Sequence, residues 1–224
     1  MEFQGYSLSL PHNTLVERGA LLNHTAHYSD HRILVTRDSY LASGIRHSPV
    51  PLCLCRIYAD IDEALAAVQQ IQPLYLIVDL EGWEMPVLAL LDHLRSLQHR
   101  YPAVEMVLIT PELDPVTQQF LQSALRCRLI EKRLALPLAR EALQRTVEAL
   151  PAQVRLFKTK EWSVLMLMAQ GHSLSHIARL QIRPYHRIVY RVGCILSLLQ
   201  LNHRQQLLRV LQRVSALHDR HHSG

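Results

Sequence analysis

The sequence predicts an α/β unit with a parallel sheet, followed by a smaller unit built of helices alone. Short β-type runs alternate with amphipathic helical stretches between residues 31 and 150, which is the pattern of β-α-β units. Residues 151–224 show helical periodicity without β-type alternation. The charge changes at the same boundary, because residues 1–150 hold 13 Lys and Arg against 17 Asp and Glu, a net −4, whereas residues 151–224 hold 11 against 2, a net +9. We therefore expect two compact units after an extension over residues 1–30 that lacks sustained periodicity.

Five β-α repeats are predicted in residues 31–150. The expected strands cover residues 33–36, 52–57, 75–80, 104–110 and 128–132. The expected helices cover residues 40–46, 62–70, 85–99, 114–126 and 138–149. The third and fourth strands are nearly continuous in apolar residues and should be central in a doubly wound parallel sheet. In such sheets the chemistry lies beyond the carboxyl ends of the strands.

Four helices are predicted in residues 151–224. They cover residues 160–170, 174–180, a third stretch from Pro184 to about residue 200, and 203–217. Gly171 suits the position just after the first helix, Ser173 can cap the second, and Pro184 suits the first turn of the third. Two short helices joined by a tight turn to a longer basic one are typical of a helix-turn-helix.

A spaced set of residues marks the start of this helical unit: Glu161, Val164, Leu165, Ala169, Gly171, Ser173, Ile177 and Ala178. The set resembles the start of the LuxR-type helix-turn-helix, also called the NarL/FixJ class, over residues 157–178. The resemblance implies a four-helix domain that binds double-stranded DNA. Independently of the family, the apolar members should form a small core: Val164, Leu165, Met168, Ile177 and Ala178.

The helix that would read DNA departs from the family pattern. Arg183-Pro184 replaces the usual Ser or Thr cap, and Val189, Tyr190 and Gly193 fall where polar or basic contact residues are common. The remaining candidates for phosphate or base contacts are Arg183, His186, Arg187, Tyr190 and Arg191. For each of these, the alternative is a side chain that only hydrates the helix surface.

Three residues at strand ends give residues 31–150 a resemblance to the receiver domain of a response regulator. By strand position, Asp79 matches the phosphorylated aspartate of that class, Thr110 matches its hydroxyl residue, and Lys132 matches its lysine. Pro137 follows Lys132 by five residues, as in that class. Aspartyl phosphorylation needs such a nucleophile, a divalent ion held by further acids, and a hydroxyl and a lysine to hold the product. The resemblance makes Asp79 a candidate phosphorylation site, with a pocket formed by Arg37, Asp38, Thr110 and Lys132.

The acid pair of this receiver pattern is incomplete. Arg37-Asp38 stands where receivers commonly have two acids. A guanidinium close to Asp79 would pair with the carboxylate and compete with Mg²⁺ for the same charge. We therefore favour Asp79 as a structural acid paired with Arg37 or Lys132, and phosphorylation of Asp79 stays open as the alternative.

Several classes of protein are disfavoured by the composition. No stretch of about 18 residues is apolar and free of charge, and the N-terminus lacks the basic start of a signal peptide, so we expect a cytoplasmic protein without a membrane partner. The four cysteines, Cys53, Cys55, Cys127 and Cys194, are scattered, which favours reduced thiols over a metal or disulfide site. No P-loop, G-x-S-x-G motif or paired-carboxylate constellation is recognisable, so we expect no enzyme, no cofactor and no metal.

The function predicted from these features is that of a DNA-binding transcription regulator with a degenerate receiver domain, working without aspartyl phosphorylation. The domains expected are the extension 1–30, the pseudo-receiver 31–150 and the helix-turn-helix domain 151–224. The expected partners are double-stranded DNA and a second subunit, either another copy or a different regulator. The alternative is a co-regulator that forms a heterodimer with another response regulator and contributes little DNA readout itself.

Overall fold

A five-stranded parallel sheet forms the centre of the first unit in the computed structural model, which describes residues 32–47, 55–133 and 154–217. The strands are β1 (Arg32–Val35), β2 (Cys55–Tyr58), β3 (Tyr75–Asp79), β4 (Glu105–Thr110) and β5 (Cys127–Glu131). Their order in the sheet is β2-β1-β3-β4-β5. From β1 the chain continues to β2 on one side and then crosses to β3 on the other, so the direction of winding reverses between β1 and β3. Doubly wound sheets of this order bind ligands at that switch point, beyond the carboxyl ends of the strands.

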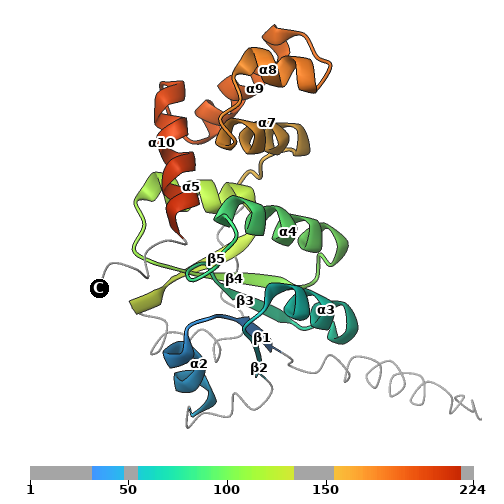
Figure 1. Cartoon of the computed structure of the whole chain (residues 1–224), viewed down its shortest axis with the longest axis vertical. Coiled ribbons are helices and arrows are strands. Elements are labelled where there is room, and N and C mark those ends of the chain that lie inside the picture. The colour runs from blue at the N-terminus through green and yellow to red at the C-terminus, as the bar shows by residue number, and fades with distance from the viewer. Residues whose placement is uncertain (1–31, 48–54, 134–153, 218–224) are drawn as a thin grey trace, which may run out of the picture.

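Helices cover both faces of the sheet (Figure 1). On one face lies α2 (Ser39–Arg46), whose Leu41 and Ile45 pack with Tyr75 and Ile77 of β3. On the other face lie α3 (Ile61–Ile71), α4 (Val87–Arg100) and α5 (Pro115–Ala124), which share a core with the alternate residues of the strands. This alternation follows from the two-residue period of a strand. The predicted doubly wound fold is confirmed, and β3 and β4 are interior strands as expected.

Aspartate side chains begin three of these helices. Asp38, Asp60 and Asp114 each accept hydrogen bonds from two backbone N–H groups in the first turn of α2, α3 and α5, respectively. Such caps satisfy amides that have no partner within the helix. For Asp38 the cap also fixes a carboxylate at the carboxyl end of β1, which is the edge of the sheet where ligand sites form.

The second unit consists of four helices, α7 (Thr159–Ala169), α8 (Leu174–Leu180), α9 (Tyr185–Leu198) and α10 (Arg204–Ser215). All members of the predicted small core are buried: Val164, Leu165, Met168, Ile177 and Ala178. Gly171 ends α7 with a φ of +85°, a conformation that glycine adopts without strain, and Ser173 caps α8. None of the described helices combines the length and the apolar character needed to cross a bilayer.

Most predicted boundaries differ from the observed ones by one or two residues. Helices α4 and α9 begin two residues and one residue after their predicted starts, because Pro86 and Pro184 stand at the N-cap positions and not inside the helices. Proline fixes φ and lacks an amide hydrogen, so it suits the start of a helix. The predicted helix 138–149 and the extension 1–30 lie outside the described residues.

Aromatic rings join the two units. Phe157, just before α7, packs 5.3 Å from Phe120 of α5 and is stacked on Trp162 of α7 at 6.3 Å between ring centroids. Trp162 donates its indole N–H to Asp92 Oδ1 of α4 at 2.7 Å, and the Arg95 guanidinium lies over the same ring at 4.7 Å. Cation–π contacts of this kind add to the energy of buried aromatic area.

Helix α10 extends the same junction (Figure 1). It contacts α4 and α5, and Arg213 Nη1 lies 2.6 Å from Asp114 Oδ2. Gln119 of α5 donates to the carbonyl of Leu198 at the end of α9, at 2.7 Å. One hydrophobic cluster therefore runs from the sheet through the junction into the helical unit, whereas the sequence suggested two compact units without showing that they share a core.

Candidate functional sites at the sheet edge and on helix α9

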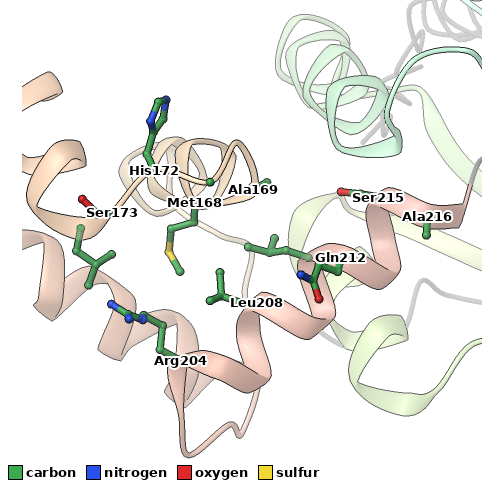
Figure 2. A pocket seen from close by; sticks show the side chains of 12 residues that line it. Met168, Ala169, His172, Ser173, Arg204, Leu208, Gln212, Ser215 and Ala216 are labelled. Atoms are coloured by element: carbon green, nitrogen blue, oxygen red, sulfur yellow. The ribbon is translucent and has the colours of Figure 1, made fainter.

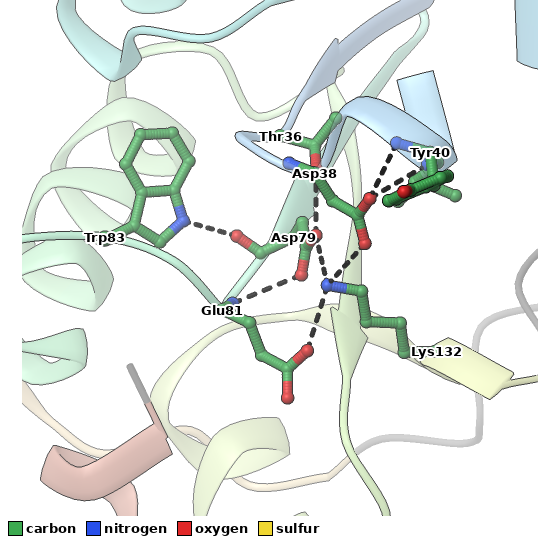
Figure 3. Close-up of polar contacts among 8 residues, drawn as sticks. Thr36, Asp38, Tyr40, Asp79, Glu81, Trp83 and Lys132 are labelled. Carbon is green, nitrogen blue, oxygen red and sulfur yellow. Dashed lines mark hydrogen bonds and ion pairs between the residues drawn. The ribbon is translucent and has the colours of Figure 1, made fainter. Parts of the chain in front are cut away.

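Three carboxylates surround one ammonium at the carboxyl ends of β1, β3 and β5 (Figure 3). Lys132 Nζ lies 3.1 Å from Asp38 Oδ2, 3.0 Å from Asp79 Oδ2 and 2.9 Å from Glu81 Oε2. The Asp79 side chain has no exposed surface, and that of Lys132 is 17% exposed. We name Asp38, Asp79, Glu81 and Lys132 the carboxylate pocket.

The carboxylate oxygens and the backbone carbonyl of Asp79 also accept hydrogen bonds. Thr36 donates its hydroxyl to Asp79 Oδ2 at 2.8 Å, and the Glu81 amide donates to Oδ1 at 3.2 Å. Trp83 donates its indole N–H to the backbone carbonyl of Asp79 at 2.5 Å. Both carboxylate oxygens of Asp79 therefore have donors, as a buried charge requires.

The contacts in the pocket favour the charged forms of Asp38 and Lys132. Partial burial pushes the pKa of Asp38 upward, but hydrogen bonds from the Leu41 amide and from Lys132 outweigh it and bring that pKa below its usual range. Burial alone would lower the pKa of Lys132, yet the attraction of Asp79 and the hydrogen bonds of the three carboxylates raise it. Lys132 is therefore a permanent cation near neutral pH, and it partly neutralises the three acids.

Arg37 lies outside the pocket, and the expectation that it could pair with Asp79 is wrong. Its Nη1 lies 2.9 Å from Glu84 Oε1, and its guanidinium carbon lies 5.4 Å from the centre of the Trp83 ring. The residue that reaches Asp79 from the end of β1 is its neighbour Thr36. Of the two partners considered for Asp79, the structure places Lys132 against it.

Thr110 is buried at the end of β4, but it donates no hydrogen bond to the four residues of the carboxylate pocket among the described contacts. Sequence reasoning missed Thr36, Glu81 and Trp83. Glu81 carries a usable signal, because it follows Asp79 by two residues at a strand end. Thr36 and Trp83 carry none, since their roles depend on the turns after β1 and β3.

The pocket has one acid fewer after β1 than the receivers it resembles, because Arg37 stands beside Asp38 and faces Glu84. Asp38, Asp79 and Glu81 are the acids present, and each directs an oxygen at the Lys132 ammonium. Mg²⁺ needs an almost octahedral shell of oxygens, and the replaced acid removes one oxygen ligand from it. The arrangement is a partly neutralised acid cluster of three carboxylates around one ammonium.

Helix α9 presents two different faces. Its inner face, with Ile188, Val192 and Ile195, is buried against the other helices of the unit. Its outward face carries His186, Val189, Tyr190, Gly193 and Ser197, all exposed. These positions are three or four residues apart and so form one stripe. The stripe contains no Lys or Arg, although the unit is strongly basic.

The predicted arginine contacts lie along one edge of this stripe. Arg183 and Arg187 are exposed at the start of α9. Arg191 is half-buried, and its Nη1 donates to Gln181 Oε1 at 2.8 Å, which ties α9 to the end of α8. The five predicted contact residues thus all lie on α9 or in the turn before it, but Arg191 already has a partner within the protein.

A groove of about 630 Å³ lies on another side of the helical unit, between the end of α7, the turn into α8, and α10 (Figure 2). Met168 and Leu208 project into it, and Arg204 and Gln212 line its α10 side. None of the residues of the outward stripe of α9 lines this groove. The stripe therefore lies outside this groove.

The strand order β2-β1-β3-β4-β5, with an acid at the end of β3, is that of receiver domains, and α7 to α10 carry the LuxR-type spacing in helices. The two units therefore have the receiver-like and helix-turn-helix folds that the sequence predicts. Helix α9 is the second helix of the helix-turn-helix arrangement, and the carboxylate pocket lies at the carboxyl end of β3.

Comparison with known proteins gives one similar sequence and several similar folds. No model of a known protein family matches the chain. The Fimbriae Y protein of Salmonella typhimurium (strain LT2) is 29% identical over 215 residues, which are 93% of this chain and 89% of that protein. RcsB of Salmonella enterica serovar Typhimurium, bound to the promoter rprA, aligns with 18% identity and a TM-score of 0.45 over 82% of this chain and 98% of that chain. The chemotaxis protein CheY4 of Vibrio cholerae aligns with 19% identity and a TM-score of 0.42 over 53% of this chain and 100% of that chain.

Proposed function

We propose that this protein is a cytoplasmic, non-enzymatic transcription regulator that binds double-stranded DNA through α9 and works without phosphorylation of Asp79. The observation that carries the proposal is the exposure of α9 on a unit of net charge +9, in the helix-turn-helix arrangement of α8 and α9. A recognition helix of this kind enters the major groove of DNA.

Electrostatics supports a polyanionic partner. Arg183 and Arg187 are exposed along one edge of the outward stripe, where they can neutralise phosphates beside a groove. Neutralised phosphates release counterions, which supplies affinity that falls steeply with salt. The junction through Phe157 and Trp162 leaves this side of α9 in solvent, so the receiver-like unit does not cover it.

The carboxylate pocket supports independence from phosphorylation. An attacking Asp79 would have to leave Lys132, Thr36 and the Glu81 amide, and it would bring a phosphoryl group towards two further carboxylates. Receivers offset the charge of that reaction with a divalent ion held beside two acids after the first strand, and here Arg37 replaces one of those acids. The receiver-like unit then serves as a scaffold and as a surface for association with another subunit.

The absence of basic residues from the outward stripe of α9 favours a second candidate function. In that case the protein is a co-regulator that pairs with another response regulator, and the partner supplies most of the sequence readout. A homodimer and a heterodimer are both compatible with the proposal.

Fluorescence anisotropy of the full chain with labelled duplexes tests the proposed function. The protein alone should bind duplex DNA, with an affinity that falls steeply as salt rises from 50 to 200 mM, as counterion release requires. A chain carrying Arg183→Ala and Arg187→Ala should bind much more weakly, whereas Arg209→Ala, an exposed arginine on α10, should bind like the wild type. Binding only in the presence of a second regulator would favour the co-regulator.

A further inference from the structure

Gly193 occupies the middle of the outward stripe of α9 for no reason internal to the protein. A Cβ atom at this position would meet no atom within 4 Å, so packing does not require a glycine. Its backbone is helical, with no positive φ that would require one either. Glycine inside a helix costs about 0.5–1 kcal/mol relative to alanine. A missing side chain that benefits neither packing nor conformation indicates close approach by something outside the molecule.

Two neighbours of Gly193 on the stripe, Val189 and Tyr190, expose apolar area, and the polar Ser197 lies one turn further along. Tyr190 is 73% exposed and Val189 is 42% exposed. Each base presents a different edge in the major groove: guanine suits Arg or Lys, adenine suits Asn or Gln, cytosine suits Asp or Glu, and the thymine methyl suits an apolar group. Among these side-chain types, the stripe offers only the apolar ones.

Resting on the DNA binding proposed above, we infer that Val189, Tyr190 and Gly193 form a surface that reads thymine methyl groups in the major groove. Gly193 lets the helix backbone lie close to the floor of the groove. Val189 and Tyr190 then contact C5-methyl groups on either side of it, while Arg183 and Arg187 hold the phosphates. Sequence preference thus comes from apolar contact where related proteins use polar side chains.

DNA suits this surface better than a protein segment does. The stripe lies on a single helix, and exposed arginines stand along one edge of it. The major groove is about 12 Å wide and accepts a single helix between two rows of phosphates. A protein partner would instead need an apolar groove rimmed with acids to match the same pattern.

Uracil substitution gives a direct test, because uracil differs from thymine only by the methyl group. The full chain is first used to enrich duplexes from a randomised library of 20 base pairs, and the enriched duplex is then made with uracil at each thymine in turn. We expect enriched sites with fixed thymines, and a loss of roughly fourfold in affinity for each contacted methyl that is removed. Uracil placed outside the enriched site should have no effect.

The variants Val189→Ala and Tyr190→Ala locate the contact. Each should bind the thymine duplex more weakly and should lose its sensitivity to uracil at one position while keeping it elsewhere. Enrichment of a site defined by G·C pairs, or equal affinity of the wild type for thymine and uracil duplexes, would overturn the inference and leave the proposed DNA binding intact. Failure to enrich any duplex would overturn both.

The variant Gly193→Ala separates the effect of residue 193 on DNA affinity from its effect on the stability of the fold. The variant should unfold at a temperature about 2 °C higher, because the helix gains a better residue, yet bind the enriched duplex at least tenfold more weakly. Gly44→Ala, an exposed glycine inside α2, is the matched control and should raise stability without changing DNA affinity. Unchanged DNA affinity of Gly193→Ala would contradict close approach to DNA and assign the stripe to a protein contact.

Discussion

The carboxylate pocket and the outward stripe of α9 are opposite kinds of surface. In the pocket, Lys132 contacts three carboxylates, and Asp79 accepts further hydrogen bonds from Thr36 and the Glu81 amide. On the stripe, Tyr190 and Val189 lie in solvent, and the space beside Gly193 is open. The first region satisfies its own charges, whereas the second leaves apolar area exposed to water.

This difference indicates where a ligand is expected. Charges that are already paired and buried gain little from a new partner, because binding must first break the existing contacts. Exposed apolar area beside unpaired basic residues gains from any partner that removes it from water. The buried, paired acids of the receiver-like unit and the exposed surface of α9 are the basis of the proposal that this protein binds DNA without phosphorylation of Asp79.

The largest expected effect concerns Lys132. Lys132→Met removes the cation and leaves three carboxylates close together, so the free energy of unfolding should fall by about 3 kcal/mol, as for other broken buried ion pairs. Arg133→Met, at a side chain that is 66% exposed, should change it by less than about 1 kcal/mol. Urea unfolding at pH 7 measures both. Equal losses for the two variants would mean that Lys132 does not offset the charge of the three carboxylates.

The next effect concerns DNA affinity and Arg187. Arg187→Ala should weaken binding to duplex DNA about tenfold and reduce the slope of affinity against salt by about one phosphate contact. Arg209→Ala should stay within about twofold of the wild type, because α10 does not carry the recognition face. Arg191→Ala should also lower the unfolding temperature, since Arg191 holds Gln181. Anisotropy titrations at several salt concentrations would contradict this order if Arg187 and Arg209 behaved alike.

A smaller effect is expected at Asp38. Asn keeps the helix cap but loses the charge that faces Lys132, so Asp38→Asn should cost about 1 kcal/mol at pH 7. The pKa of Asp38 is lowered in the folded protein, so its contribution is present above the ordinary value of about 3.9 and is lost as the pH falls through the lower, folded value. Unfolding of both proteins between pH 7 and pH 3 should therefore converge at the acidic end. A difference that grows on acidification would contradict the sign of the shift.

The sequence predicted the elements better than the contacts. Hydrophobic periodicity placed all five strands and the four C-terminal helices, because it reports burial along each element. Strand ends placed Asp38, Asp79 and Lys132 at one edge, since parallel strands present their carboxyl ends together. The direction of Arg37 was not predictable, because the turn that carries Trp83 provides both Glu84 and an aromatic ring as partners away from Asp79.

The junction between the two units was equally hidden in the sequence. Phe157 and Trp162 lie within the stretch that resembles the helix-turn-helix, and their apolar character alone predicts only burial. Their partners, Phe120 and Asp92, are more than 30 residues away in the chain and become neighbours only when α4 and α5 cover the sheet. Long-range pairs of this kind require the fold itself.

The affinity of the full chain for its enriched duplex, with and without acetyl phosphate and Mg²⁺, tests the central claim most directly. The wild type and Asp79→Asn should bind with dissociation constants within about twofold of each other under both conditions, since Asp79 is held by Lys132 and α9 is already exposed. Phosphate-affinity gels on the same samples should show no shifted band. A tenfold or greater tightening by acetyl phosphate that is lost in Asp79→Asn, together with a shifted band in the wild type, would contradict the account.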